Sequence, residues 1–199
     1  MQDVPDSGEM KVPPGTLVTP SARELAESRG VKILEVPEDQ LGGLAPPEKT
    51  IAIGADHGGF QLKEQLKPML ERAGLAIRDV GVYDEKPADY PDIAQQVAEL
   101  VAGGAAARGI VIDGAGIGSS MTANKVPGIR AALCYDRASA KNSREHNDSN
   151  VLTLGARLLT GTQAEDVVRV WMDTAFAGGR HAARIAKITA VERKYAKNP

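Results

Sequence analysis

From residue 50 onward, short apolar runs alternate with longer segments whose apolar residues recur at helical spacing. The segment 60–72 shows the helical spacing most clearly, because Leu62, Leu66 and Met69 fall on one face and Gly74 follows as a stop signal. The same two patterns predict strands over 50–54, 76–80, 109–112, 129–134 and 151–154, and helices over 60–72, 92–101, 118–125, 138–144, 164–176 and 182–194.

Such alternation requires a parallel sheet that helices cover on both faces. We therefore predict an α/β fold, a three-layer α/β/α sandwich around a five-stranded parallel sheet. The commonest strand order, 2-1-3-4-5, places the first and third strands side by side, and ligands bind where the order reverses. Asp56 and His57 follow the first strand, and Asp113 and Gly114 follow the third, so we expect the two pairs to meet there.

Residues 1–48 follow a different pattern. Residues 1–15 mix proline, glycine and charged residues without periodicity, which is typical of a disordered tail. Residues 16–36 predict a helix–strand arm, in which Thr19 caps a helix that begins with Pro20 and Gly30 ends it before a strand over 31–36. Residues 37–48, rich in proline and glycine, indicate a linker, so the main domain spans 49–199.

The composition excludes several classes of function. The chain has 199 residues, 42% hydrophobic and 25% charged, with a net charge of −2 and 4% aromatic residues, which offers no footprint for nucleic acid. No apolar run approaches the roughly 20 residues that cross a bilayer, and the N-terminus lacks a secretory pattern, so a cytoplasmic protein is the simplest interpretation. The single Cys134 excludes an internal disulfide, and its apolar surroundings predict a buried side chain.

The segment 109–125 is the most informative part of the chain. Its apolar run ends on Asp113 and enters the glycine loop 114–118 before the next helix. Glycine lets a ligand approach the backbone, and the N-terminus of the following helix favours an anion. The spacing matches neither a Walker loop nor a dinucleotide fingerprint, so a small phosphorylated ligand is favoured over a dinucleotide and over a plain turn.

Two other segments, 144–150 and 178–184, gather polar side chains. Arg180 and Arg184 lie one helical turn apart, which suits a phosphate or equally a solvated helix face. We expect the three histidines, His57, His146 and His181, to lie in polar or glycine-rich loops and to be functional. The alternative is that they are three unrelated surface residues.

Other chemistries find little support in the sequence. No two histidines have the spacing of a metal chelate, and Gly-x-Ser-x-Gly is absent, so neither a metal site nor a serine nucleophile is predicted. A helix cap is the alternative role for Asp56.

Together the motifs become specific. In chain order they are Asp-His-Gly-Gly-Phe-x-Leu-Lys (56–63), Asp-Tyr-Pro-Asp (89–92), Gly-x-Gly-Ile-Gly (114–118), Ala-Asn-Lys-Val-Pro-Gly-Ile-Arg-Ala (123–131), Ser-Arg-Glu-His-Asn-Asp (143–148) and Gly-Gly-Arg-His (178–181). Over about residues 51–195 this pattern resembles the type B ribose-5-phosphate isomerase family, which includes the galactose-6-phosphate isomerase subunits. The resemblance implies a Rossmann-like α/β sheet, a homodimer or dimer of dimers with sites at the subunit interface, and no cofactor or metal.

The resemblance also implies roles for single residues. His146 would assist opening of the sugar ring, Asn147 would hold sugar hydroxyls, and arginines with His181 would bind phosphate, some of them from the other subunit. The amides of the glycine loop would hold the enediolate. The implied substrate-binding residues are Asp56, His57, Tyr90, Gly114, Ala115, Gly116, Gly118, Asn124, Asn147, Arg157, Arg180, His181 and Arg184.

The chain departs from the family pattern at Asp113 and Ala115. Many members carry a cysteine at the first position, whose thiolate moves the proton between C2 and C1, and often a threonine at the second. Cys134 lies at the end of a different strand and cannot replace that thiolate. We therefore expect Asp113 to be the base and His146 to be the other catalytic residue; an acid that only binds loop amides or a sugar hydroxyl is the alternative.

The expected function is that of an aldose–ketose isomerase of sugar phosphates, with ribose 5-phosphate to ribulose 5-phosphate favoured. A tetrose or hexose phosphate as substrate, and a non-catalytic sugar-phosphate-binding homologue, are the alternatives. Residues 16–36 are similar to short segments of enzymes in bacterial microcompartments, which suggests a shell or cargo partner; an oligomer-stabilising arm or an inert extension is the other interpretation.

Overall fold

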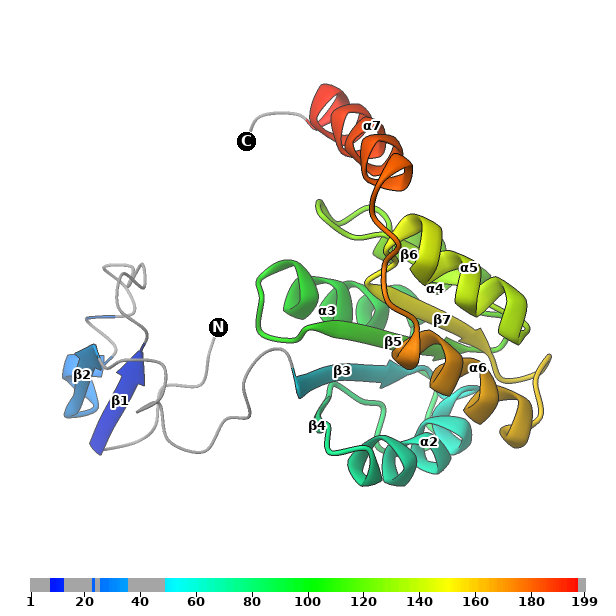
Figure 1. Cartoon of the computed structure of the whole chain (residues 1–199). Helices are drawn as coiled ribbons and strands as arrows, with labels where there is room; N and C mark the ends of the chain where they lie inside the picture. Colours follow the sequence, from blue (N-terminus) through cyan, green and yellow to red (C-terminus); the bar gives the residue numbers. More distant parts are fainter. Residues whose placement is uncertain (1–7, 13–22, 24–25, 36–48, 197–199) are drawn as a thin grey trace. The chain divides into compact units, whose positions relative to one another are not determined.

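The computed structural model describes residues 8–12, 23, 26–35 and 49–196 (Figure 1). The chain folds into two units, Met1–Ala45 and Pro46–Pro199. Within the described ranges, no helix is long and apolar enough to cross a membrane.

The first unit contains a two-stranded parallel sheet. Strand β1 (Gly8–Val12) pairs with β2 (Val31–Glu35) along their whole length. The prediction that residues 1–15 lack regular structure is therefore wrong for 8–12, because this segment gains backbone hydrogen-bond partners from β2.

A short helical stretch precedes β2, as the arm prediction requires. Residues 26–28 are helical, and Gly30 follows with a φ of 66°, a left-handed conformation that glycine adopts without strain. Ala26 and Val31 are buried against each other. The predicted cap at Thr19 and Pro20 and the linker 37–48 lie outside the described residues.

The second unit is built around a five-stranded parallel sheet with the order β4-β3-β5-β7-β6, which confirms the predicted Rossmann-like α/β fold. Its strands are β3 (Thr50–Ala55), β4 (Ala76–Asp79), β5 (Arg108–Asp113), β6 (Ala131–Leu133) and β7 (Val151–Gly155). Its helices are α2 (Phe60–Arg72), α3 (Tyr90–Ala102), α4 (Ile117–Ala123), α5 (Arg137–Asn147), α6 (Gly161–Asp173) and α7 (Arg180–Tyr195).

The strand order differs from the prediction at one end of the sheet. The first and third strands of this unit, β3 and β5, are neighbours as expected, but β7 lies between β5 and β6. Every residue of β7 is buried, whereas the three residues of β6 are only partly buried. The longer and fully buried strand β7 therefore lies inside the sheet, and the shorter, partly buried β6 is its edge strand.

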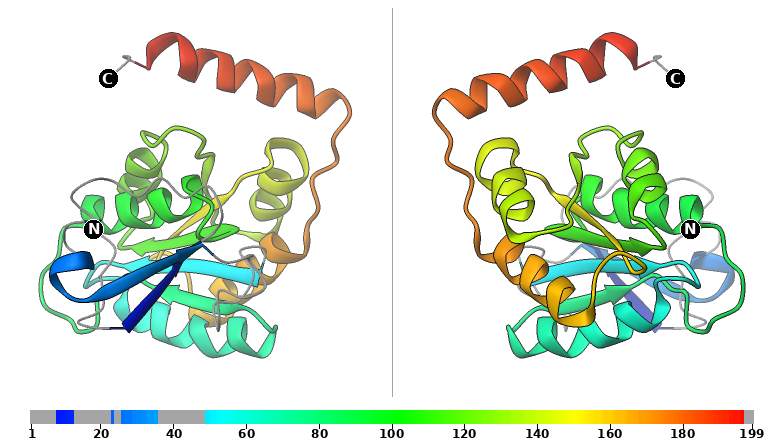
Figure 2. Two further views of the ribbon diagram at one scale, coloured as in Figure 1. Left: turned by 90° about the vertical axis from the view of Figure 1, so that its left-hand side faces the viewer. Right: turned by 90° about the vertical axis from the view of Figure 1, so that its right-hand side faces the viewer.

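Helices cover both faces of this sheet (Figures 1 and 2). Helices α2, α5 and α6 pack on the face to which Ile110 and Ile112 of β5 point, and α3 and α4 pack on the face to which Val111 points. Helix α7 lies beyond these layers, and His181 is its one buried residue. The carboxyl ends of the strands remain uncovered by helices and are open to a ligand.

A buried ion pair connects α2 to the end of β4. Lys63 is fully buried, and its Nζ donates to both carboxylate oxygens of Asp79 at 2.7 Å. Asp79 also accepts hydrogen bonds from Lys67 Nζ at 2.8 Å and from the Gly81 amide at 2.9 Å. Burial acts to raise the pKa of Asp79, but these hydrogen bonds outweigh it and hold that pKa below the ordinary value.

We expect Asp79→Asn to lower the free energy of unfolding by about 3 kcal/mol, because it leaves the buried Lys63 ammonium with only the 40% exposed Glu64 carboxylate, 3.1 Å away, as a charged partner. Denaturant unfolding measures this change. Lys67→Met is the matched control, since the Lys67 side chain, 24% exposed, also binds Asp79 but should contribute less than about 1 kcal/mol. Equal losses in the two variants would contradict this interpretation.

The same pair predicts a pH dependence. Because the pKa of Asp79 is lower in the folded protein, its ionised form contributes stability. This stability is fully present above the pKa of the unfolded chain, about 3.9, and is lost as the pH falls through the lower pKa of the folded protein. In Asp79→Asn the free energy of unfolding should therefore fall less between about pH 5 and low pH than it does in the wild type, as denaturant unfolding at a series of pH values measures.

Candidate active site

A cavity of about 450 Å³ opens at the carboxyl ends of β3, β5 and β7. It lies between the neighbouring strands β3 and β5, so the predicted meeting of the Asp56–His57 and Asp113–Gly114 pairs is confirmed. The residues that line it are Asp56, His57, Gly58, Tyr90, Asp113, Gly114, Ala115, Gly118, Arg157 and Leu158.

Asp113 holds the glycine loop in place. One carboxylate oxygen accepts the amide N–H groups of Ala115, at 2.7 Å, and of Gly116. The other accepts the amide of Ser119 at 3.1 Å and its hydroxyl at 2.5 Å. The side chain is 5% exposed; two of its four hydrogen bonds hold the glycine loop, and the two from Ser119 tie the end of β5 to the first turn of α4. This arrangement favours the alternative role, an acid that binds loop amides, over the expected role of Asp113 as base.

The bonds to Asp113 decide which loop amides remain for a ligand. The amides of Ala115 and Gly116 are already used, so they do not form the expected anion site. The amides of Gly114, Ile117 and Gly118 have no acceptor among the residues that the structure describes. Two of them belong to the first turn of α4, where helical amides lack internal partners.

Asp56 and His57 lie in the turn between β3 and α2. One Asp56 oxygen accepts the Gly59 amide at 2.9 Å, so this residue does help to fix the start of α2, although Gly59 itself occupies the cap position. His57 accepts the Ala88 amide on Nδ1 at 3.3 Å. In this arrangement Nδ1 carries no proton, and the Nε2–H is the donor that His57 offers to a ligand.

Tyr90 and Arg157 complete the lining of the cavity. The Tyr90 ring lies where a side chain on Gly118 would be, within 2.4 Å of the added Cβ. Arg157 is exposed, and its guanidinium lies over Gly114, where Nε would be 3.5 Å from an added Cβ. Glycine at these two positions therefore leaves room for an aromatic ring and a cation at the cavity.

A second cluster forms around two stacked histidines. The rings of His146 and His181 lie 4.3 Å apart and nearly parallel, at 4°. Desolvation, and then the positive fields of His146, Arg180 and Arg184, lower the pKa of His181. The expectation that both histidines lie in loops is wrong: His146 belongs to the last turn of α5 and His181 to the first turn of α7.

The predicted site residues form two groups, one at the carboxyl ends of the parallel strands and one at their amino ends. The cavity lies at the carboxyl ends of the strands. Helix α5 begins after the carboxyl end of β6 and ends before the amino end of β7, so His146 and Asn147 lie at the other edge. The Ala177 amide donates to the Glu145 carbonyl at 3.0 Å and keeps the start of α7 near that end. One chain thus brings Asp56, His57 and Asp113 together but not His146, Arg180 or Arg184.

Asn124 and Cys134 have structural roles. Asn124 donates to the carbonyls of Ser120 and Ala131 and accepts the Ala131 amide, so its side chain closes the turn after α4 instead of facing the cavity. Cys134 is fully buried, as expected, and burial raises the pKa of its thiol.

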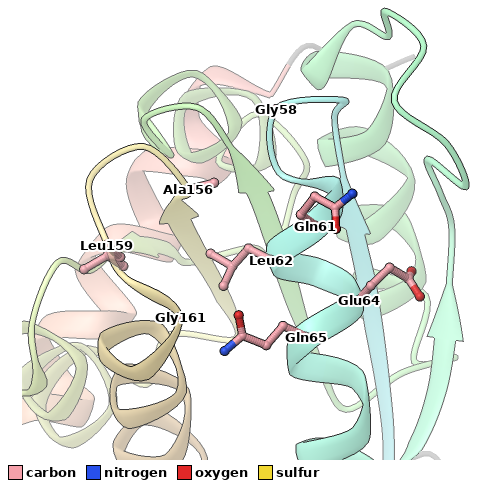
Figure 3. Close-up of a pocket in the computed structure, with 8 residues that line it drawn as sticks. All are labelled: Gly58, Gln61, Leu62, Glu64, Gln65, Ala156, Leu159 and Gly161. Carbon is pink, nitrogen blue, oxygen red and sulfur yellow. The ribbon is translucent and has the colours of Figure 1, made fainter.

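A neighbouring hollow of about 490 Å³ carries none of the predicted residues (Figure 3). Leu62 and Gln65 of α2 point across it toward Ala156 and Gly161. Its polar groups are already paired, since Gln61 donates to Glu85 at 2.6 Å and Gln65 donates to Glu165 at 3.0 Å. It therefore offers few free groups for recognition.

Sequence reasoning missed Ser119 and Leu158. A serine in the first helical turn after an acid can return a hydrogen bond to that acid, so the spacing of Asp113 and Ser119 was a usable signal. Leu158 gives no such signal, because an apolar residue after a strand suggests the core, yet it is 57% exposed at the cavity.

Two glycines of the loop allow a matched test. An added Cβ at Gly116 would meet backbone atoms of Leu154 and Gly155 at 2.9 and 3.1 Å, and its φ is 77°, so Gly116→Ala should cost about 2 kcal/mol or more in unfolding free energy. Gly118→Ala meets only the far end of the Tyr90 ring, so it should cost less than about 1 kcal/mol but displace that ring and raise KM. Denaturant unfolding and steady-state kinetics measure both effects; an unchanged KM in Gly118→Ala would contradict the placement of Tyr90.

In the described ranges, no group of three or more His, Cys, Asp or Glu side chains could hold a metal ion.

Comparison with known proteins gives consistent results. A family model described as ribose/galactose isomerase matches residues 51–188. Ribose-5-phosphate isomerase B of Escherichia coli is 44% identical over 73% of this chain and 98% of its own. D-erythrulose-4-phosphate isomerase of Pectobacterium atrosepticum is 41% identical over 70% of this chain and 92% of its own. The solved structure of Clostridium thermocellum ribose-5-phosphate isomerase B aligns with a TM-score of 0.73 at 48% identity, covering 74% of this chain and 99% of that one.

Proposed function

The chain belongs to the ribose/galactose isomerase family and is a sugar-phosphate isomerase, and we propose that it interconverts ribose 5-phosphate and ribulose 5-phosphate. The observation that carries this proposal is the cavity itself, where two carboxylates, a histidine N–H donor and an arginine surround a glycine loop. Aldose–ketose isomerisation needs these parts: a base for a carbon-bound proton, donors for the developing oxyanion and a cation for the phosphate.

Each part of the cavity has a role in this proposal. The free amides of Gly114, Ile117 and Gly118 stabilise the enediolate oxygen. His57 donates Nε2–H to a sugar oxygen, and Tyr90 bounds the sugar on the side of α3. Arg157 binds the phosphate together with the cationic cluster of Arg180, His181 and Arg184.

In this proposal, the cationic cluster that faces each cavity belongs to a second copy of the chain. His146, for ring opening, and Asn147, for the sugar hydroxyls, lie at the opposite edge of the same chain. A two-fold symmetric dimer sets the cavity edge of each copy against the cluster edge of the other and forms two identical sites. The apolar residues Ile188 and Val191 of α7, 47% and 59% exposed in the single chain, would gain partners in such a dimer.

The first 48 residues lie outside the family match, which begins at residue 51. We propose that this segment serves assembly, with a microcompartment shell or another copy as partner, and takes no part in catalysis. Its separation from Pro46–Pro199 as a unit of its own supports this division.

A panel of four-, five- and six-carbon aldose phosphates tests the activity. We expect the highest kcat/KM with ribose 5-phosphate, and deuterium incorporation at C2 in heavy water. The chain that begins at residue 49, assayed beside the full chain, should keep this kcat/KM within about twofold, because the segment touches no substrate in this proposal.

Two outcomes would favour the alternatives. Preference for a tetrose phosphate would agree with the erythrulose-phosphate relative and with the absence of a hydroxyl at Ala115. Binding of sugar phosphates without any exchange at C2 would make the protein a non-catalytic homologue.

Mixing of inactive variants tests the shared site. His57→Ala and His146→Ala should each be inactive, whereas a mixture that exchanges subunits should regain about a quarter of wild-type activity, because half of the dimers then hold one intact site. His57→Ala mixed with Arg157→Ala is the control and should regain nothing, since both residues come from the same edge of one chain. Equal behaviour of the two mixtures would exclude the proposed dimer.

A further inference from the structure

Asp56 and Asp113 are neighbours across the adjacent strands β3 and β5. The register pairs Ala55 of β3 with Ile112 of β5, so the next residue on each strand is the aspartate. The Asp56 amide donates to the Ile112 carbonyl at 3.1 Å, which continues this pairing beyond the strand end. Both carboxylates line the cavity, and they are 9% and 5% exposed. The cavity therefore contains a pair of buried acids, and each of them can have a different role.

The acceptor positions of the Asp113 carboxylate are all occupied. An ionised carboxylate offers about four acceptor positions, and Asp113 accepts four hydrogen bonds from Ala115, Gly116 and Ser119. To take a proton from a sugar carbon, it would have to release a donor that holds the loop. Since that loop also presents the free amides, such a release would disturb the enediolate site.

His57 is not the acceptor either. Its Nδ1 already accepts the Ala88 amide, so Nε2 carries the proton. In this state the imidazole can donate to a sugar oxygen but has no free lone pair with which to remove a proton from carbon.

Asp56 has the open lone pairs. One of its oxygens accepts the Gly59 amide at 2.9 Å, and no other described residue donates to the carboxylate. Its second oxygen is thus unoccupied by protein donors, in a side chain that is nine-tenths buried and lines the cavity. A base for a carbon-bound proton needs this combination of an available lone pair and shielding from water.

We infer that Asp56 is the catalytic base that carries the proton between C2 and C1, and that Asp113 is a positioning residue that holds the glycine loop. The inference rests on the proposed isomerase function and assigns its central step. It also moves the base from the end of β5, where the sequence predicts it, to the end of the adjacent strand β3.

The step balances without a cofactor. Asp56 takes the C2 proton of the open-chain aldose phosphate, the C–H electron pair becomes the C1=C2 bond, and the carbonyl pair moves to O1. The resulting enediolate oxygen lies against the free loop amides. The Asp56 carboxyl then returns its proton to C1, while the O2 proton moves to O1 and the C2=O bond forms.

Asp56→Asn tests the assignment directly, because asparagine keeps the acceptor for the Gly59 amide but cannot take the proton. With ribose 5-phosphate in heavy water, we expect exchange at C2 and turnover to fall by about 10²–10⁴-fold, while calorimetry still detects binding of the sugar phosphate. Asp173→Asn changes an exposed carboxylate at the end of α6 in the same way and should retain wild-type exchange.

Ser119→Ala distinguishes the two acids even if Asp56→Asn fails to fold. It removes one donor from Asp113, so the acid limb of kcat/KM against pH moves upward if Asp113 is the base and stays in place if Asp56 is. A moving limb, or exchange in Asp56→Asn within about tenfold of the wild type, overturns the assignment. A wild type without exchange for any aldose phosphate overturns the proposed function, and this inference with it.

Discussion

The parallel pairing of β3 with β5 is the constraint on which the site depends. Parallel strands end at the same edge of a sheet, so the residues that follow them meet without any long connection. Here the register places Asp56 beside Asp113, and the turn after each strand contributes its own element, α2 or α4. A one-residue slip would send one of the two carboxylates to the opposite face, so the buried apolar residues of both strands also fix the acid pair.

The surroundings of this pair are held by polar contacts that lie away from the cavity. Lys63 and Asp79 join α2 to β4, and the segment after β4 supplies the Ala88 amide that orients His57. Tyr83 adds a hydrogen bond from its hydroxyl to the Asp79 carbonyl at 2.9 Å. The ion pair thus fixes the start of the segment 79–88, whose last residue donates to His57.

Much of the fold follows from the sequence, but less of the site does. Helix α2 spans the predicted residues because its apolar spacing and its following glycine are local signals. The exchange of β6 and β7 was not predictable from periodicity, since both are short apolar runs and their order depends on which one the helices bury. The two roles considered for Asp113, a base and an acid that binds loop amides, could not be separated from the sequence: residue types place an acid at a glycine loop, but only the structure shows that loop amides and Ser119 occupy its lone pairs. The loop assignment of His146 and His181 failed because polar residues at helix ends are hard to tell from turn residues.

The burial of Cys134 has a consequence for the conditions in which such a site can work. It is the one sulfhydryl of the chain, it is fully buried, and its raised pKa keeps it in the thiol form. The acids that line the cavity are carboxylates, and the residues that line it include no sulfur atom for peroxide to oxidise. Oxidation of the chain's one thiol would therefore take place in the core, outside the residues that line this cavity.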